Sequence, residues 1–495
     1  MKKFTKLVAV AVCSIASTIS LTACNGGGNT SSGGGKGELP SIENPWWNDV
    51  GTVEKDSNGK PVFHDVSIKL TSVICGNDQN GFEALIDEFE AEYDNQITIT
   101  HQTYNQLAID ETVKTQIQNE TAAPDLILTH QKTHTQFAAE KLIQPMDNAY
   151  NLAGIEVDTS NFLPNFAEYC DLGYTGRMFT TPVDAQSMVV YYNKNLLKKY
   201  NAELPTNRTE FIDLCKRVQK EEKKTNGQFQ ALTCGMDSEW TNMYLLPTAI
   251  VQNGGEFYGE DGKVHWDEGE NLSAFQRGVK SVQGLRDEGI WNFNESFEAS
   301  RSRFCSDNAL FYFSLPFDSN VIFSAYSQRS GHSIDTVKSQ DIGGFSLSGL
   351  FAMEGSPESS RTKIFGDSHA FMMSKTVEDV EKKAAIATFV NWFTTKVNVG
   401  IEWAKLGHTT ASYEIRGNAE YNADPYVENF SNMFYTDINN FVTAGKNKNY
   451  SLIFGDLQTT LLNCVTNTTN DTEIKNELSR VKQRVNAAID LANLG

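Results

Sequence analysis

Hydrophobic and polar positions follow two different periods along the chain. Residues 66–74 alternate at period two and are followed by Gly76, which predicts a half-buried β-strand. Helical spacing then joins the apolar residues Phe82, Leu85, Ile86, Phe89 and Tyr93. Residues 97–104 predict a second strand, and residues 124–128 predict a short buried one after another helix. Strands separated by helices of this length predict βαβ units and a parallel sheet.

The rest of the chain continues this α/β pattern. A further strand is expected near 178–190, and helices are expected at 380–393 and 474–489. With 495 residues the chain is long enough for two to four lobes, and a content of 11% aromatic residues excludes a mainly disordered protein. The formal net charge of −20 argues against a nucleic-acid partner, because phosphate backbones recruit basic surfaces.

The first residues predict a targeting signal. Lys2, Lys3 and Lys6 precede an apolar run over 7–21 that is too short and too rich in Ser and Thr for a membrane-spanning helix. Leu21-Thr22-Ala23-Cys24 then resembles the bacterial lipoprotein signal, in which the cysteine is lipidated and becomes the new N-terminus. The alternative is an ordinary secretory signal with an incidental cysteine. The sequence thus predicts a signal peptide over 1–23 and a lipid (palmitate) on Cys24.

A Gly/Ser-rich segment follows this cysteine. Residues 24–61 are expected to form a flexible tether, because the composition of 25–35 cannot bury a core. A lipid and a tether would hold the folded part at the extracytoplasmic face of the cell membrane. Trp46 and Trp47 are candidates for folding back onto the body.

Cysteine and histidine spacing gives no metal motif. The six cysteines after the tether contain no Cys-x-x-Cys pair, and the sequence leaves open whether they form disulfides or stay buried thiols. His130 and His134 are four residues apart, but they lack the intervening Glu of a zinc hydrolase and an evident third ligand. We therefore expect no metal and no cofactor.

Five ordered motifs carry a resemblance. The segment 177–197, with Thr181-Pro182 and then Tyr192-Asn193-Lys194, resembles the sugar-type extracellular solute-binding proteins of ABC importers, which include the maltose-binding proteins. Further similar segments follow in the family's order: Pro205–Phe211, Gly254-Gly255 with Asp261-Gly262-Lys263, Gly366–Lys375 and Gly407–Ala411. The last lacks the proline that the family usually has there.

The resemblance implies a two-lobe periplasmic-binding-protein-like α/β fold. Each lobe would be a mostly parallel sheet flanked by helices, with a ligand cleft at the hinge. It implies a first lobe over 62–181 plus 363–411 and a second over 182–362 plus 412–495. It also implies a monomeric subunit that closes around a carbohydrate and delivers it to the transmembrane subunits of an ABC permease.

Polar and aromatic residues in the loops after strands are the candidate ligand contacts, because sugars need paired hydrogen bonds and an aromatic face. They are Asp78, Gln79, His130, Asp184, Gln186, Trp240, Phe317, Asp318, Asp367 and Ser368. Asp78 or Gln79 could equally cap the helix that begins there, and Phe317 and Phe313 could be core. Trp392 and Trp403 are expected in the core.

No catalytic motif appears. There is no phosphate-binding Gly-Lys-Ser/Thr sequence, and Gly344-Phe345-Ser346-Leu347-Ser348 lacks the last glycine of a nucleophile elbow. We therefore predict a binding protein and not an enzyme. The alternative is a surface glycan-binding or glycan-hydrolysing lipoprotein, since paired carboxylates are spatial and escape a sequence search. The sequence motifs do not identify the sugar, its chain length or the type of cell envelope.

Overall fold

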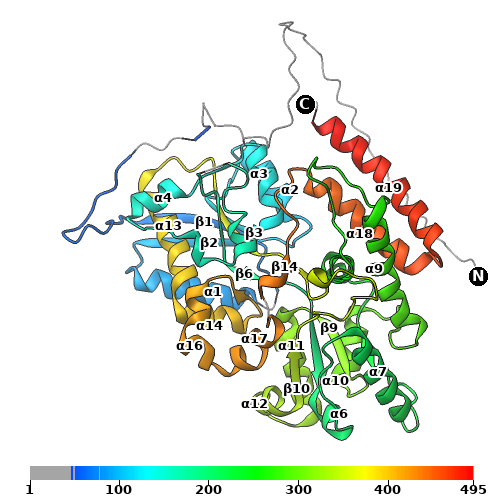
Figure 1. Ribbon diagram of the computed structural model, residues 1–495. Coiled ribbons are helices and arrows are strands. Elements are labelled where there is room, and N and C mark those ends of the chain that lie inside the picture. Colours follow the sequence, from blue (N-terminus) through cyan, green and yellow to red (C-terminus); the bar gives the residue numbers. More distant parts are fainter. Residues whose placement is uncertain (1–45, 48–50, 77, 175, 437, 494–495) are drawn as a thin grey trace, which may run out of the picture. The chain divides into compact units, whose positions relative to one another are not determined.

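The computed structural model describes residues 46–47, 51–76, 78–174, 176–436 and 438–493. Its first sheet begins as predicted. Strand β1 (Val66–Ser72) pairs in parallel with β2 (Ile97–Thr103) on one side and with β3 (Leu126–His130) on the other. Helices α1 (Gln79–Glu92) and α2 (Ile109–Gln118) form the connections (Figure 1). The expected βαβ units are therefore confirmed.

The same sheet is completed by strands that arrive from distant parts of the chain. Strand β12 (His369–Ser374) runs antiparallel to β3, and both β4 (Ile143–Gln144) and β5 (Thr180–Pro182) pair antiparallel with β12. The sheet is thus mixed, and the expectation of a mostly parallel sheet was wrong. Strand direction here is set by how the chain re-enters the lobe, which periodicity does not encode.

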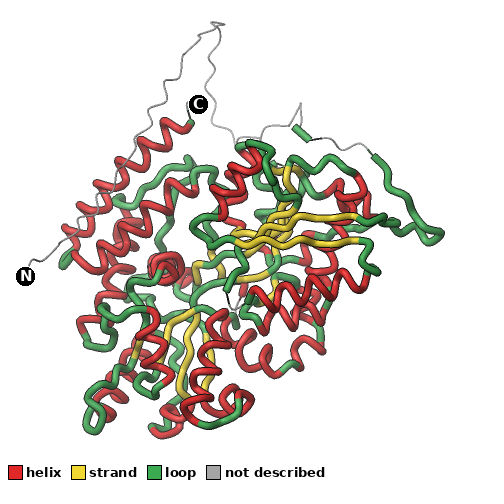
Figure 2. Tube along the Cα trace, turned by 180° about the vertical axis from the view of Figure 1, so that it is seen from behind, coloured by secondary structure: helices red, strands yellow, loops and turns green. Residues whose placement is uncertain are grey.

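A second sheet has four strands. Its order is β10 (Ile342–Phe345), β7 (Val189–Asn193), β9 (Phe311–Ser314) and β8 (Leu232–Thr233). Only the β8–β9 pair is parallel. Figure 2 shows the strands of the two sheets in separate groups, with helices around them.

Each sheet has its own hydrophobic core. One core is built from residues between 63 and 183 and between 371 and 403, and includes α4 (Asp147–Ala153) and α13 (Val380–Thr395). The other draws on residues between 188 and 365 and between 444 and 489, and includes α9 (Gly269–Asp287), α18 (Tyr450–Asn467) and α19 (Asp471–Ala492). The two-lobe α/β class is confirmed.

Helices α13 and α19 cover the late helices predicted at 380–393 and 474–489, and Trp392 and Trp403 are buried as expected. The remaining α-helices are α3 (Gln131–Ala139), α5 (Pro164–Ala167), α6 (Lys194–Lys199), α7 (Arg208–Glu222), α8 (Leu246–Gln252), α10 (Phe297–Cys305), α11 (Ser319–Ser330), α12 (Ile334–Thr336), α14 (Val397–Lys405), α15 (Tyr413–Gly417), α16 (Ala419–Ala423) and α17 (Asn432–Phe434).

The chain passes between the two sheets three times. The first passage follows β5 and contains β6 (Asp184–Ala185), which pairs with β13 (Thr409–Thr410) in the third passage. The second passage ends at Asp367, which forms an isolated bridge with Gln186. The first passage is therefore hydrogen-bonded to each of the other two.

The signal peptide, Cys24 and most of the predicted tether fall in residues 1–45, outside the described residues. Trp46 lies against the first lobe: its indole N–H donates to the carbonyl of Ile143 at 2.8 Å, and Trp47 meets the ring of Phe179 edge-on. Within the described chain, no helix is long and apolar enough to cross a membrane. The six described cysteines are unpaired, and of them only Cys75 is exposed.

Candidate ligand-binding cleft

A cavity of about 280 Å³ opens where the loops after the strands of both sheets meet the three passages. Its lining residues are Val73, Ile74, Cys75, Gly76, Asp78, Asn105, Gln106, His130, Gln186, Glu239, Trp240, Phe317, His369 and His408. The carboxyl ends of parallel strands converge at one edge of a sheet, so this is the place where such a fold collects side chains from many elements.

The wall from the first lobe is polar. Cys75 and Asp78 follow β1, Gln106 follows β2, and His130 ends β3. Asp78 occupies the N-cap position of α1 but accepts no capping hydrogen bond there. The side-chain amide of Gln106 is shielded from solvent and makes no hydrogen bond within the described chain. This wall therefore presents polar atoms that are free for a ligand.

The wall from the second lobe is aromatic. Trp240 follows β8 and Phe317 follows β9, and their half-buried rings meet edge-on with centroids 5.4 Å apart. A π-helical turn (Thr241–Leu245) begins directly after Trp240, and the Thr241 hydroxyl donates to the carbonyl of Gly235 at 2.6 Å. That bond fixes the loop that carries the indole.

Asp318 fixes the loop that carries Phe317. Its carboxylate is fully buried and accepts hydrogen bonds from Tyr312 at 3.0 Å, Ser314 at 3.0 Å and Arg301 at 2.8 Å. Sequence analysis had placed Asp318 among the ligand contacts, but all of these partners belong to the protein and Asp318 does not line the cavity. It supports the wall from behind.

Glycine is required where this wall meets the third passage. Gly407 has φ +98°, and a Cβ there would lie 2.4 Å from Cα of Phe317. Any side chain at position 407 would therefore push the second-lobe loop away from His408.

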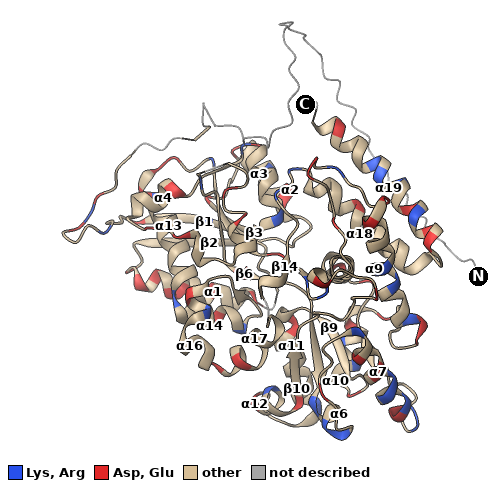
Figure 3. Ribbon diagram, in the orientation of Figure 1, with Lys and Arg blue, Asp and Glu red and all other residues tan. Residues whose placement is uncertain are grey.

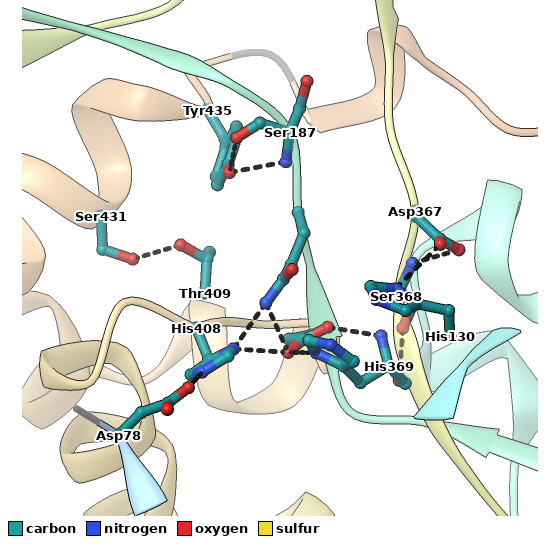
Figure 4. A network of polar contacts seen from close by, with 12 residues as sticks. Asp78, His130, Ser187, Asp367, Ser368, His369, His408, Thr409, Ser431 and Tyr435 are labelled. Carbon is teal, nitrogen blue, oxygen red and sulfur yellow. Dashed lines mark hydrogen bonds and ion pairs between the residues drawn. The ribbon is translucent and has the colours of Figure 1, made fainter. Parts of the chain in front are cut away.

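A network of charged groups forms the floor of the cleft (Figure 4). Asp184 is fully buried and accepts hydrogen bonds from the backbone N–H of His369 at 2.7 Å, from Nδ1 of His369 at 2.8 Å and from Nδ1 of His408 at 3.0 Å. The other ring nitrogen of His408 lies 2.9 Å from Oδ2 of Asp78. Gln186 contacts both groups, with Nε2 3.5 Å from Asp184 and 2.6 Å from His408. The network thus joins all three passages to the first-lobe wall.

His408 is held as a cation. Burial lowers the pKa of its imidazole, but hydrogen bonds to Asp184 and Asp78 outweigh burial and raise the pKa to about 9. Burial raises the pKa of Asp184, yet the charges and hydrogen bonds of His369 and His408 bring it well below its usual range. The indole of Trp403 stacks on the His408 ring at 4.0 Å and 13°, which favours a cationic imidazolium.

A second buried charge group lies beside this network. Lys132 pairs with Asp367 at 3.0 Å, and Nδ1 of His130 lies 3.1 Å from the same carboxylate oxygen. Burial and the nearby charge of Lys132 lower the pKa of His130 to about 4, so its ring is neutral at neutral pH. Behind the cavity lining, Lys132 also contacts Sδ of Met243 in the second lobe at 3.1 Å. This group therefore connects the two lobes.

The structure sorts the ten sequence-predicted contacts into two sets. The residues that line the cavity are Asp78, His130, Gln186, Trp240 and Phe317. The residues outside its lining are Gln79, Asp184, Asp318, Asp367 and Ser368. Gln79 donates to Glu83 along α1 at 2.9 Å, and the hydroxyl of Ser368 donates to the carbonyl of His369 at 2.7 Å.

Sequence reasoning did not select several lining residues. Gln106 and Asn105 follow β2, so the rule that found Asp78 after β1 and His130 at the end of β3 would have found them too. Glu239 adjoins Trp240. His369 and His408 lie in segments recognised for their resemblance, but nothing in the linear sequence indicates that both converge on Asp184.

Asp184, His369 and His408 are also the one group of three metal-ligand types in the described chain whose ligand atoms lie within 4.8 Å of one another. Both imidazole Nδ1 atoms are hydrogen-bonded to Asp184. These two hydrogen bonds are enough to explain why the three side chains lie close together.

Two α/β lobes, joined by three passages with a polar and aromatic cavity between them, define a two-lobe fold of the periplasmic-binding-protein type. The comparisons with known proteins agree. Residues 76–304 match the family model of bacterial extracellular solute-binding proteins, which confirms the resemblance found in the sequence.

Among curated proteins, the sn-glycerol-3-phosphate-binding periplasmic protein UgpB of Escherichia coli (strain K12) is 26% identical over 187 residues, or 34% of this chain. The match spans 41% of the length of that relative.

Solved structures are similar over much more of the chain. The GacH receptor of Streptomyces glaucescens has a TM-score of 0.66 at 16% identity and covers 85% of this chain and 98% of its own. The maltose-bound MalE3 of T. maritima has a TM-score of 0.65 at 16% identity and covers 86% of this chain and 100% of its own. At this identity the likeness concerns the fold.

Proposed function

We propose that this protein is the extracytoplasmic substrate-binding lipoprotein of an ABC transporter. It captures a sugar or short oligosaccharide by closure of its two lobes and delivers the ligand to a membrane permease. The cavity between the lobes is the observation that carries the proposal, because one wall offers hydrogen-bonding groups and the other offers two aromatic rings. Its volume of about 280 Å³ favours a short ligand over a long chain.

The wall chemistry suits a carbohydrate. The C–H face of a pyranose is weakly positive and stacks on indole or phenyl rings, which Trp240 and Phe317 supply. Hydroxyl groups need donors and acceptors, and Asp78, Gln106 and Gln186 supply them from the opposite side. The solved structures of similar fold include a maltose-bound protein and a maltotriose-bound protein, which supports the same ligand class.

Closure follows from the position of the cavity. A ligand that contacts both walls stabilises the closed arrangement by its differential affinity for the two states. The three passages are short, paired segments of the kind that serve as hinges. Asp184, Asp318 and Asp367 act in this proposal as positioning residues, while the cavity-lining residues touch the ligand.

The lipid on Cys24, the monomeric state and the extracytoplasmic location remain part of the proposal. The lipoprotein-like sequence at 21–24 supports the lipid, and the extracellular family that residues 76–304 match supports the location. Radiolabelled palmitate incorporation that disappears in Cys24→Ala would test the anchor.

The test of the main proposal is a thermal-shift screen of the protein against a panel of mono-, di- and trisaccharides. A ligand at ~100 times its Kd adds about 2.7 kcal/mol of stability and raises Tm visibly. Alkylation of Cys75, followed by peptide mass mapping, locates the ligand, because Cys75 is exposed and lines the cavity. Protection of Cys75 by the same sugar supports the site.

A panel without any shift, or a shift without protection of Cys75, would contradict the proposal. The glycan-hydrolase alternative is tested in parallel with chromogenic glycosides, where turnover would favour the enzyme.

A further inference from the structure

The cleft holds more negative than positive charge. Among the described residues that line the cavity none is Lys or Arg, and its one cation, His408, is held between two carboxylates. Lys132 lies behind the lining and is matched by Asp367. Asp78, Asp184, Asp367 and Glu239 therefore stand against two cations. Outer helices such as α7 and α19 carry many of the basic residues instead (Figure 3).

Among the described residues, Glu239 is the one of these four carboxylates that has no cationic partner. It is exposed at the cavity, and in the described part of the chain no hydrogen bond or ion pair reaches its side chain. The three acids deeper in the cleft each have a cationic partner, so Glu239 alone has its full acceptor capacity free.

Two other residues that line the cavity suit a cation in it. Trp240, the next residue, is half-buried and shares the wall with Phe317, and aromatic faces attract ammonium groups. His130 is more than nine-tenths buried and lines the cavity, and its Nδ1 lies 3.1 Å from Oδ2 of Asp367. A neutral imidazole adds a polar group without adding positive charge.

We infer that the cleft contains a subsite for a protonated amine at Glu239 and Trp240, so that the preferred ligand is a saccharide that bears a basic nitrogen. The saccharide part of this inference rests on the proposed function; the charge of the subsite does not. A phosphorylated sugar is excluded by the same arrangement, because a phosphate group finds no Arg or Lys and meets an unpaired carboxylate.

Cys75 allows the charge to be measured without any ligand. Its thiol lines the same cavity. Two methanethiosulfonate reagents, one with a cationic trimethylammonium group and one with an anionic sulfonate group, therefore react with it at rates that report the local electrostatic potential. The same Cys75 thiolate attacks the sulfenyl sulfur of either reagent, forming a disulfide and releasing methanesulfinate, so the thiol pKa cancels in the ratio of the two rates. Peptide mass mapping assigns the adduct to Cys75, and N-acetylcysteine amide gives the reference ratio.

The cation-to-anion rate ratio at Cys75 is expected to exceed the reference ratio, and Glu239→Gln should lower it by at least about threefold. Glu256→Gln is the matched control, because Glu256 is an exposed acid that lines a different cavity. A ratio at or below the reference, or equal effects of the two variants, would overturn the subsite.

A ligand series tests the saccharide part. β-1,4-linked disaccharides that carry a hydroxyl, an acetamide or an ammonium group at C2 are compared by calorimetry in mildly acidic buffer. The ammonium form should bind at least about tenfold more tightly, and Glu239→Gln should remove that preference. Preference for the neutral forms would overturn the inference. Failure of every saccharide would instead count against the proposed function, while the thiol ratio still decides the charge of the subsite.

Discussion

The two walls of the cleft are built on opposite principles. The first-lobe wall rests on a buried ionic network in which Asp184, His408 and Asp78 join two of the chain passages to the loop after β1. The second-lobe wall is a pair of half-exposed rings, each on its own loop. A hydrogen bond from Thr241 to Gly235 holds one loop, and the buried Asp318 with its partners Tyr312 and Arg301 holds the other. The polar wall is therefore coupled to the hinge, whereas the aromatic wall can be altered with little effect on the rest of the molecule.

Removal of Asp184 should have the largest effect and break the polar wall. Asp184→Ala leaves a buried His408 cation with one carboxylate instead of two and orphans the donors of His369. Loss of one partner from a buried charge pair costs about 3–5 kcal/mol, so the free energy of unfolding in urea should fall by that amount. Asp184→Asn keeps the volume and should lose less. A change below about 1 kcal/mol in Asp184→Ala would show that the network does not stabilise the hinge.

The pH dependence of stability should follow His408. Its pKa is raised to about 9 in the folded protein, above the ordinary 6.5, so its contribution is complete below about pH 6.5 and is lost as the pH rises through 9. The difference between the two pKa values corresponds to about 3 kcal/mol. Urea unfolding at a series of alkaline pH values should show this loss in the natural protein and a flatter profile in His408→Gln.

His332→Gln, a half-exposed histidine outside the network, is the control and should keep the natural slope. Identical profiles for His408→Gln and the natural protein would contradict the cationic state. The carboxylates act in the opposite direction: the lowered pKa values of Asp184 and Asp367 give stability that is lost on acidification.

Trp240→Ala should weaken ligand binding while stability stays nearly unchanged. The indole packs on Phe317 at the cavity and is only partly buried, so its removal costs binding free energy of about 1–3 kcal/mol, or roughly 5–150-fold in Kd. Calorimetry with the saccharide found in the screen measures it. Trp46→Ala removes an indole that packs on the first lobe outside the cavity and should leave affinity unchanged. Equal affinity in both variants would remove the aromatic wall from the site.

The contrast between the walls also explains what the sequence could predict. Strand and helix periodicity located β1, β2 and β3, and the residues after strands gave Asp78, His130 and Trp240 as lining residues. Such loops are local, so their position follows from the elements on either side.

The charge network could not be predicted in the same way. Its members come from passages separated by more than two hundred residues, as in the bond between His408 and Asp184, and pairing of this kind depends on tertiary structure. The sequence also predicts Asp318 as a ligand contact, whereas in the structure its carboxylate accepts hydrogen bonds from Tyr312, Ser314 and Arg301 and lies outside the cavity lining. The antiparallel direction of β12 could not be predicted either, because it depends on how the chain passes back from the second lobe to the first.

The smallest expected effect lies where the two walls touch. Gly407→Ala places a methyl group at φ +98° and 2.4 Å from the Cα of Phe317, so either the backbone strains or the aromatic loop moves. Stability should fall by about 1–2 kcal/mol, and Kd for the saccharide should rise because Phe317 shifts away from His408. Gly417→Ala is the matched control, since no atom lies within 4 Å of a Cβ there and alanine suits its helix. If Gly407→Ala changed stability but not affinity, the aromatic wall would be independent of the hinge, and the separation of the two walls would be more complete than the structure indicates.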